Sequence, residues 1–113
     1  MATACAACFR PGQPRLPEVI SECETNTARV CGTWRLGAGR TYSARWSQAS
    51  VAKIRVLRFD DDSVAFERDD PTGSSAGMHA VYRGARTSGR SAAGVVTWTY
   101  RGRRFSGAWD AEW

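Results

Sequence analysis

The stretch GSSAGMH, residues 73–79, contains the pattern G-x-S-x-G and ends at the only histidine of the chain. In α/β-hydrolases this pattern marks a strained strand-to-helix turn that exposes a nucleophilic serine, and the acid and then the histidine follow later in the chain. Here the segment MHAVYRGA alternates like a strand, and His79 precedes both later carboxylates. The sequence therefore predicts a polar loop around Ser75, with no catalytic residue and no enzyme.

Two other features carry side chains that metals use. The acidic run of residues 60–62 lacks the alternating ligands, the glycine and the terminal glutamate of a calcium-binding EF-hand loop. His79 has no second convergent group in the sequence that would complete a metal or acid–base site. We therefore interpret FDDDS as a hairpin turn and expect no metal and no cofactor.

The four cysteines follow the spacing C-x2-C-x14-C-x7-C at positions Cys5, Cys8, Cys23 and Cys31. Only the first pair has the short spacing of a zinc knuckle, whereas a zinc ribbon needs two such pairs. We expect disulfides that run from Cys5 and Cys8 to Cys23 and Cys31. Free structural thiols and a zinc site are the alternatives that the spacing leaves open.

The segment PEVISECETNTARV, residues 17–30, predicts a short helix, because proline suits a first helical turn and several apolar residues fall near one face. Along such a helix Cys23 and Cys31 would lie about 12 Å apart, which excludes a disulfide between them. The predicted organisation is an N-terminal cysteine-containing arm and helix over residues 1–30, packed on a β-barrel over residues 31–113. Together they would form a single structural domain.

An internal repeat supports the β prediction. TWRLGAGRTYSARW, residues 33–46, resembles TWTYRGRRFSGAW, residues 97–109. Each copy predicts a hairpin, with GAG as a three-residue loop in the first and Arg101-Gly102 as a two-residue turn in the second. This alignment places Trp34 opposite Tyr42 in the first hairpin and, in the second, aromatic residues 98 and 105 opposite each other.

Further strands are predicted at residues 51–59, 63–68 and 77–85, separated by runs of Asp, Pro, Gly and Ser. The total of about seven or eight short strands, with a similar aromatic hairpin at each end, predicts a small antiparallel β-barrel of the mainly β class. Closure of the last strand onto the first would protect the sheet edges.

The chain has 113 residues and a net charge of +5, which is modest for a protein dedicated to polyanions. It contains no apolar run long enough for a membrane helix and no signal-peptide pattern, so we expect a soluble protein of undefined compartment and oligomeric state. The favoured function is a non-enzymatic binding module that holds a small apolar or saccharide-like ligand in or at the mouth of the barrel. The candidate ligand-binding residues are Trp46, Tyr82, Trp98 and Trp109.

The alternative function is binding of nucleic acid or another acidic partner through a basic strand face. Alternation along the strands sends the aromatic side chains and the arginines to opposite faces, whereas stacking on nucleic-acid bases needs exposed rings beside the cations. For this reason we favour the small ligand. The candidate residues of the basic face are Arg35, Arg45, Arg55 and Arg83.

Overall fold

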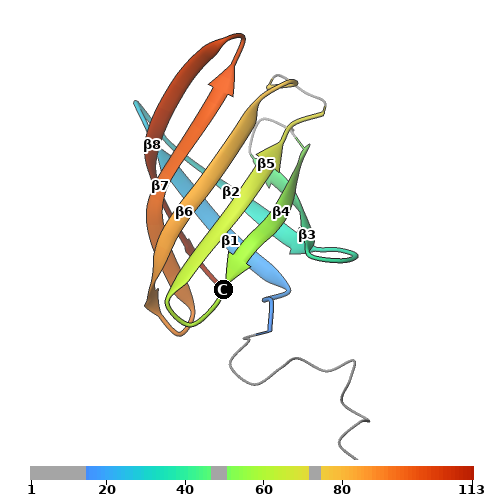
Figure 1. Cartoon of the computed structure of the whole chain (residues 1–113), viewed down its shortest axis with the longest axis vertical. Coiled ribbons are helices and arrows are strands. Elements are labelled where there is room, and N and C mark those ends of the chain that lie inside the picture. Colours follow the sequence, from blue (N-terminus) through green and yellow to red (C-terminus); the bar gives the residue numbers. More distant parts are fainter. Residues whose placement is uncertain (1–14, 47–50, 72–74) are drawn as a thin grey trace, which may run out of the picture.

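The computed structural model describes residues 15–46, 51–71 and 75–113, which form a closed antiparallel barrel of eight strands (Figure 1). Every strand pairs with its neighbours in sequence, and the last strand pairs with the first. The predicted barrel is confirmed. The strands are β1 (Val19–Thr25), β2 (Arg29–Leu36), β3 (Thr41–Trp46), β4 (Val51–Phe59), β5 (Ser63–Asp69), β6 (His79–Ser88), β7 (Ser91–Tyr100) and β8 (Arg103–Glu112).

The predicted helix over residues 17–30 is wrong, because this segment forms β1, a turn and the start of β2. β1 lies between β2 and β8, with Ile20 opposite Trp34 on one side and Ser21 opposite Glu112 on the other. It therefore closes the ring, which a helix at this place would leave open. The described residues contain no helix that is long and apolar enough to cross a membrane.

Side chains fill the interior of the barrel. The ring of Trp34 lies at its centre, with ring centroids 5.1 Å from Phe66 and 5.3 Å from Tyr82, both edge to face. Trp109, on β8, also packs against Phe66 and Tyr82. Such edge-to-face pairs contribute roughly 0.5–1.5 kcal/mol each beyond the burial of their area. The centre of the barrel is thus a packed core, and open space is found at its ends.

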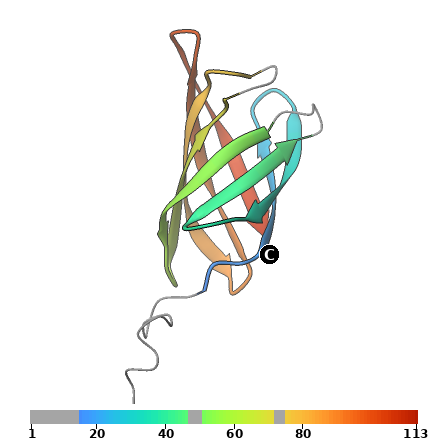
Figure 2. The same cartoon turned by 90° about the vertical axis from the view of Figure 1, so that its right-hand side faces the viewer.

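The hairpin of β7 and β8 confirms the prediction for the second repeat. Trp98 lies directly opposite Phe105, and their rings stack with centroids 5.6 Å apart. The two turn residues, Arg101 and Gly102, have φ angles of 52° and 76°. A two-residue turn with both φ angles positive matches the right-handed twist of the strands. This hairpin reaches farther than any other at the upper end of the barrel (Figure 1 and, after a 90° turn, Figure 2).

In the first repeat the predicted register is wrong by two residues. Trp34 lies opposite Ala44, and Leu36 lies opposite Tyr42. The connection spans residues 37–40, and the Gly37 N–H donates to the Thr41 carbonyl. The shift by two keeps every side chain on its predicted face, because the faces of a strand alternate with period two. Trp34 and Tyr42 still touch diagonally, with ring centroids 6.2 Å apart.

Strands β6 and β7 approach each other closely where Gly84 lies opposite Gly94. A Cβ atom on Gly94 would lie 2.5 Å from the Gly84 Cα and would collide with the carbonyl oxygen of Arg83. A Cβ atom on Gly84 would lie 2.8 Å from the ring of Trp109. Glycine within a strand is typical of such close backbone approach. The pair makes room for the ring of Trp109 in the core.

Replacing Gly94 by alanine should lower the free energy of unfolding by about 2 kcal/mol, because the added methyl group forces the two strands apart. Chemical denaturation measures the loss. Gly89→Ala is the matched control, since a Cβ atom there meets nothing within 4 Å. If both variants unfold at the same denaturant concentration, the close approach of the two strands does not matter for stability.

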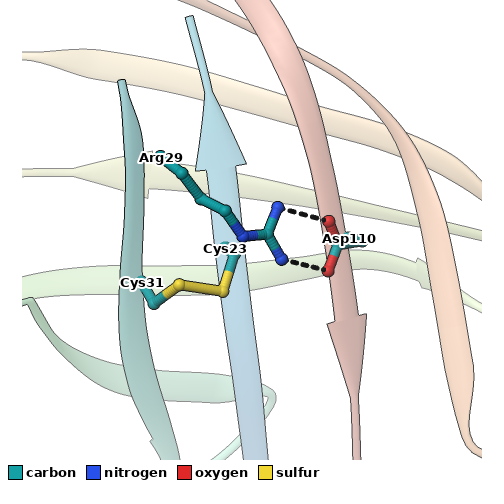
Figure 3. Close-up of a disulfide and its surroundings, with 4 residues drawn as sticks. All are labelled: Cys23, Arg29, Cys31 and Asp110. Carbon is teal, nitrogen blue, oxygen red and sulfur yellow. Dashed lines mark hydrogen bonds and ion pairs between the residues drawn. A yellow bond between two sulfur atoms is a disulfide. The ribbon is translucent and has the colours of Figure 1, made fainter.

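The outer face of the barrel carries a disulfide between Cys23 on β1 and Cys31 on β2, which lie directly opposite each other (Figure 3). Closing a loop of this length stabilises a fold by roughly 2–3 kcal/mol. Beside the disulfide, the Arg29 guanidinium reaches across β1 to the Asp110 carboxylate on β8, with N–O distances of 3.1 and 3.2 Å. Covalent and ionic links thus join three neighbouring strands where the barrel closes.

The predicted cysteine pairing is therefore wrong for Cys23 and Cys31, which bond to each other rather than to the N-terminal arm. The zinc and free-thiol alternatives fail for these two residues as well. The exclusion of this disulfide depended on the helix, and in a hairpin the same spacing brings the two sulfur atoms together. Cys5 and Cys8 lie outside the described residues, as does the predicted arm up to residue 14.

Candidate functional site at the barrel mouth

The upper end of the barrel holds a buried ion pair between Arg68 and Asp70. Alternation along β5 points both side chains inward, after Val64 and Phe66 on the same face. The guanidinium binds the carboxylate in a bidentate fashion, with Nε–Oδ1 and Nη2–Oδ2 distances of 2.6 and 2.8 Å. The side chains are only 6% and 0% exposed. The Cζ atom of Arg68 also lies over the ring of Trp46, 3.9 Å from the ring centroid.

Two further groups complete the hydrogen bonding around Arg68. Its Nη1 donates to the Tyr82 hydroxyl at 3.1 Å and lies 3.4 Å from Oε1 of Glu24. The Tyr82 hydroxyl in turn donates to Oε2 of Glu24 at 2.9 Å. Burial raises the pKa of Tyr82 well above its ordinary value, so the hydroxyl keeps its proton and remains a donor. Residues from β1, β5 and β6 thus form one rigid polar cluster.

Glu22 lies on β1 two residues before Glu24, on the same inward face, and is fully buried. Neither of its carboxyl oxygens has a hydrogen-bond partner among the described residues, and the indole N–H groups of Trp34 and Trp46 also have none. Burial raises the pKa of Glu22 to about 10, and the charge of Glu24 adds to this rise. Glu22 is therefore a neutral carboxylic acid at pH 7.

A pocket of about 330 Å³ lies above this cluster at the mouth of the barrel, and we call it the mouth pocket. Its volume falls at the lower end of the range for small-molecule sites. Thr25 at the end of β1 and the turn to β2, residues 26–28, form one side. Glu24, Arg68 and Ser75 contribute polar groups. The remaining side chains are apolar or aromatic: Val30, Trp46, Met78 and Trp98.

The structure brings some of the predicted ligand-binding residues to this pocket and places the others deeper. Trp46 and Trp98 line the mouth pocket. Tyr82 does not line the pocket but lies beneath it, where its hydroxyl forms hydrogen bonds with the lining residues Arg68 and Glu24. Trp109 is 2% exposed within the core, where its indole N–H donates to the Arg83 carbonyl. Whether these side chains bind a ligand stays a prediction.

The predicted basic residues all lie on the outer face of the barrel, three of them on the neighbouring strands β2, β3 and β4. Arg35 and Arg45 are exposed on β2 and β3, where they line a pocket together with Thr33 and Ser43. Arg55 on β4 forms an ion pair with Glu67 on β5. Arg83 lies beyond β5, on β6.

The residues of the G-x-S-x-G pattern that the structure describes form a turn rather than a catalytic triad. The Ser75 hydroxyl donates to the Asp70 carboxylate at 2.6 Å, and Gly77 has a φ of 90°. His79 begins β6 and faces outward, with Nδ1 3.0 Å from Asp69 and Nε2 3.4 Å from Glu67. Ser75 and His79 thus belong to separate networks. No cluster of His, Cys, Asp or Glu in the described part of the chain has the arrangement of a metal site.

Sequence reasoning missed the polar members of the site, which are Glu22, Glu24, Arg68 and Asp70. One signal was present: after Val64 and Phe66, the period-two alternation of β5 continues into Arg68 and Asp70. Charged residues on an inward face indicate a paired, buried group. The chain matches no known protein-family model, no curated protein and no solved structure.

Proposed function

We propose that the protein is a non-enzymatic binding module that holds a small ligand, apolar or saccharide-like, in the mouth pocket. The packed core supports this location, because the aromatic side chains fill the interior and the mouth pocket offers space beside two tryptophan rings. Concave sites that combine apolar walls with a few fixed polar groups are typical of small-molecule binding.

The observation that carries the proposal is the rigid polar floor beneath the apolar pocket. Arg68 is held by Asp70, and together with Tyr82 it holds the Glu24 carboxylate that lines the pocket, so the position of this acceptor is set before any ligand arrives. Preorganised polar groups lower the entropic cost of binding. A buried ion pair contributes little to stability compared with an apolar core of the same volume, which favours a role in recognition.

The test is a titration with a panel of small aromatic molecules and saccharides, in which tryptophan fluorescence reports binding. Binding in the mouth pocket should change the fluorescence, and Trp98→Ala should weaken the affinity at least tenfold because it removes one aromatic wall. Val95→Ala is the matched control, since Val95 lies on the same strand with its side chain exposed on the outer face. Equal affinity in both variants would place the ligand elsewhere.

The alternative function, binding of nucleic acid through the basic residues, predicts a different response. Affinity for a single-stranded oligonucleotide would fall steeply with salt, with a slope of roughly 0.7 for each neutralised phosphate. Arg45→Ala and Arg55→Ala would then weaken binding, and Trp98→Ala would not. The ion pair of Arg55 with Glu67 and the inward position of the aromatic rings speak against this outcome.

A further inference from the structure

The donors of Arg68 are almost fully used inside the protein. Four of its five N–H groups bind Asp70, Tyr82 and Glu24, and the face of the guanidinium lies on Trp46. An arginine that recognises an anion offers a free pair of N–H groups to it. Arg68 has one N–H left and is nearly buried, so it cannot provide such a fork to a ligand carboxylate or phosphate.

The free hydrogen-bonding capacity of the pocket floor is instead that of an acceptor. Each carboxylate oxygen of Glu24 accepts one bond from within the protein, from Arg68 or from Tyr82. A carboxylate has about four lone-pair positions, so at least about one remains on Glu24 even when the protonated Glu22 carboxyl is counted as a further donor. Its side chain is 19% exposed and lines the mouth pocket. A donor on the ligand can therefore reach it.

The charges of the floor add up to a negative value. Glu24 and Asp70 contribute two negative charges, and Arg68 contributes one positive charge. Glu22 also lies beneath the pocket and is neutral at pH 7, because burial raises its pKa to about 10. In a partly desolvated site one uncompensated negative charge favours a cation and disfavours an anion.

The walls of the pocket favour the same kind of ligand. Trp46 and Trp98 supply indole rings, whose π-electron faces attract an organic cation and cover its apolar body. Trp46 already contacts one cation in this way, the guanidinium of Arg68. Met78 and Val30 add apolar surface.

We infer that the mouth pocket selects an organic cation, an ammonium or guanidinium group on an aromatic or aliphatic body, with Glu24 as its counter-charge. The inference rests on the proposed binding of a small ligand in the mouth pocket, and it replaces the apolar or saccharide-like ligand by a cationic one. The ligand cation would donate a hydrogen bond to an open lone pair of Glu24, while its body lies against Trp46 and Trp98.

Three probes of similar size and different charge test this inference: 2-phenylethylammonium, 2-phenylethanol and phenylacetate. Isothermal titration calorimetry at pH 7 and low salt should give an affinity for the ammonium at least tenfold higher than for the other two. Glu24→Gln keeps the shape and one acceptor oxygen but removes the charge, so the preference for the ammonium should fall below about threefold. The affinity for the neutral alcohol should stay unchanged.

Asp69→Asn is the matched control, because it removes the same charge from an exposed side chain that does not line the mouth pocket. It should retain the preference for the ammonium. The three wild-type titrations test the inference even if Glu24→Gln does not fold. If the alcohol or the acid binds as tightly as the ammonium and Trp98→Ala weakens it, the inference is wrong and the proposed function stands. If no probe and no member of the ligand panel binds, both are wrong.

Discussion

Replacing Arg68 by methionine should lower the free energy of unfolding by about 3–5 kcal/mol. Methionine fills a similar volume but leaves the Asp70 carboxylate, which is 0% exposed, without its cation. Glu24 loses a partner at the same time. Removing one member of a buried pair costs more than the pair itself contributes, because the remaining charge stays desolvated. Denaturation in urea at pH 7 measures the loss.

Two further variants show whether the loss of stability comes from the unpaired buried charge or from removing any arginine side chain. Arg68→Met combined with Asp70→Asn should recover at least half of the lost stability, because the fully buried charge of Asp70 is then removed as well. Arg55→Met, which breaks an exposed ion pair with Glu67, should cost at most about 1 kcal/mol. A loss below about 1 kcal/mol for Arg68→Met alone would mean that water or a structural change relieves Asp70 and that the cluster is not rigid.

Replacing Glu22 by glutamine should raise the free energy of unfolding by about 3 kcal/mol at pH 7 and leave it unchanged near pH 4. The pKa of Glu22 is about 10 in the folded protein and near 4.5 in the unfolded chain. Below pH 4.5 Glu22 is protonated in both states and does not lower the free energy of unfolding. Between pH 4.5 and 10 it ionises only in the unfolded chain, so the free energy of unfolding falls by about 1.4 kcal/mol for each pH unit. Glutamine has nearly the same shape and does not ionise in the unfolded state, so it escapes this loss.

Denaturation curves of both proteins between pH 4 and pH 9 measure the effect. The wild type should lose stability relative to Glu22→Gln across this window. Glu112→Gln is the control, because the Glu112 side chain is exposed on β8. If the two curves for wild type and Glu22→Gln run parallel over the whole range, Glu22 ionises as readily in the folded protein as in the unfolded chain and its burial is incomplete.

The sequence predicted most strands because their local patterns agree with the fold. The alternating residues of β3, β4 and β5 mark an inward and an outward face, and Arg101-Gly102 favours a tight turn between β7 and β8. The same alternation correctly separated the exposed arginines from the buried aromatic residues. These features depend on neighbours within a few residues, which a single sequence displays directly.

The first strand was mistaken for a helix because its inward face carries Ile20, Glu22 and Glu24. Two glutamates on an inward face conceal the period-two apolar pattern, whereas Val19, Ile20 and Cys23 imitate a helical one. The error in the disulfide followed from this, because Cys23 and Cys31 face each other only if both segments are strands.

By itself, the sequence determined the strand faces and the small antiparallel barrel, because strand alternation and turn chemistry are local. Only the tertiary structure decided that aromatic side chains fill the interior and that β1 closes the ring between β2 and β8. It also decided that Glu24 meets Tyr82, 58 positions later, and Arg68, 44 positions later. Such buried charges are tolerated only when they have partners, and here the partners come from distant strands. A local sequence pattern does not show which distant strands lie side by side.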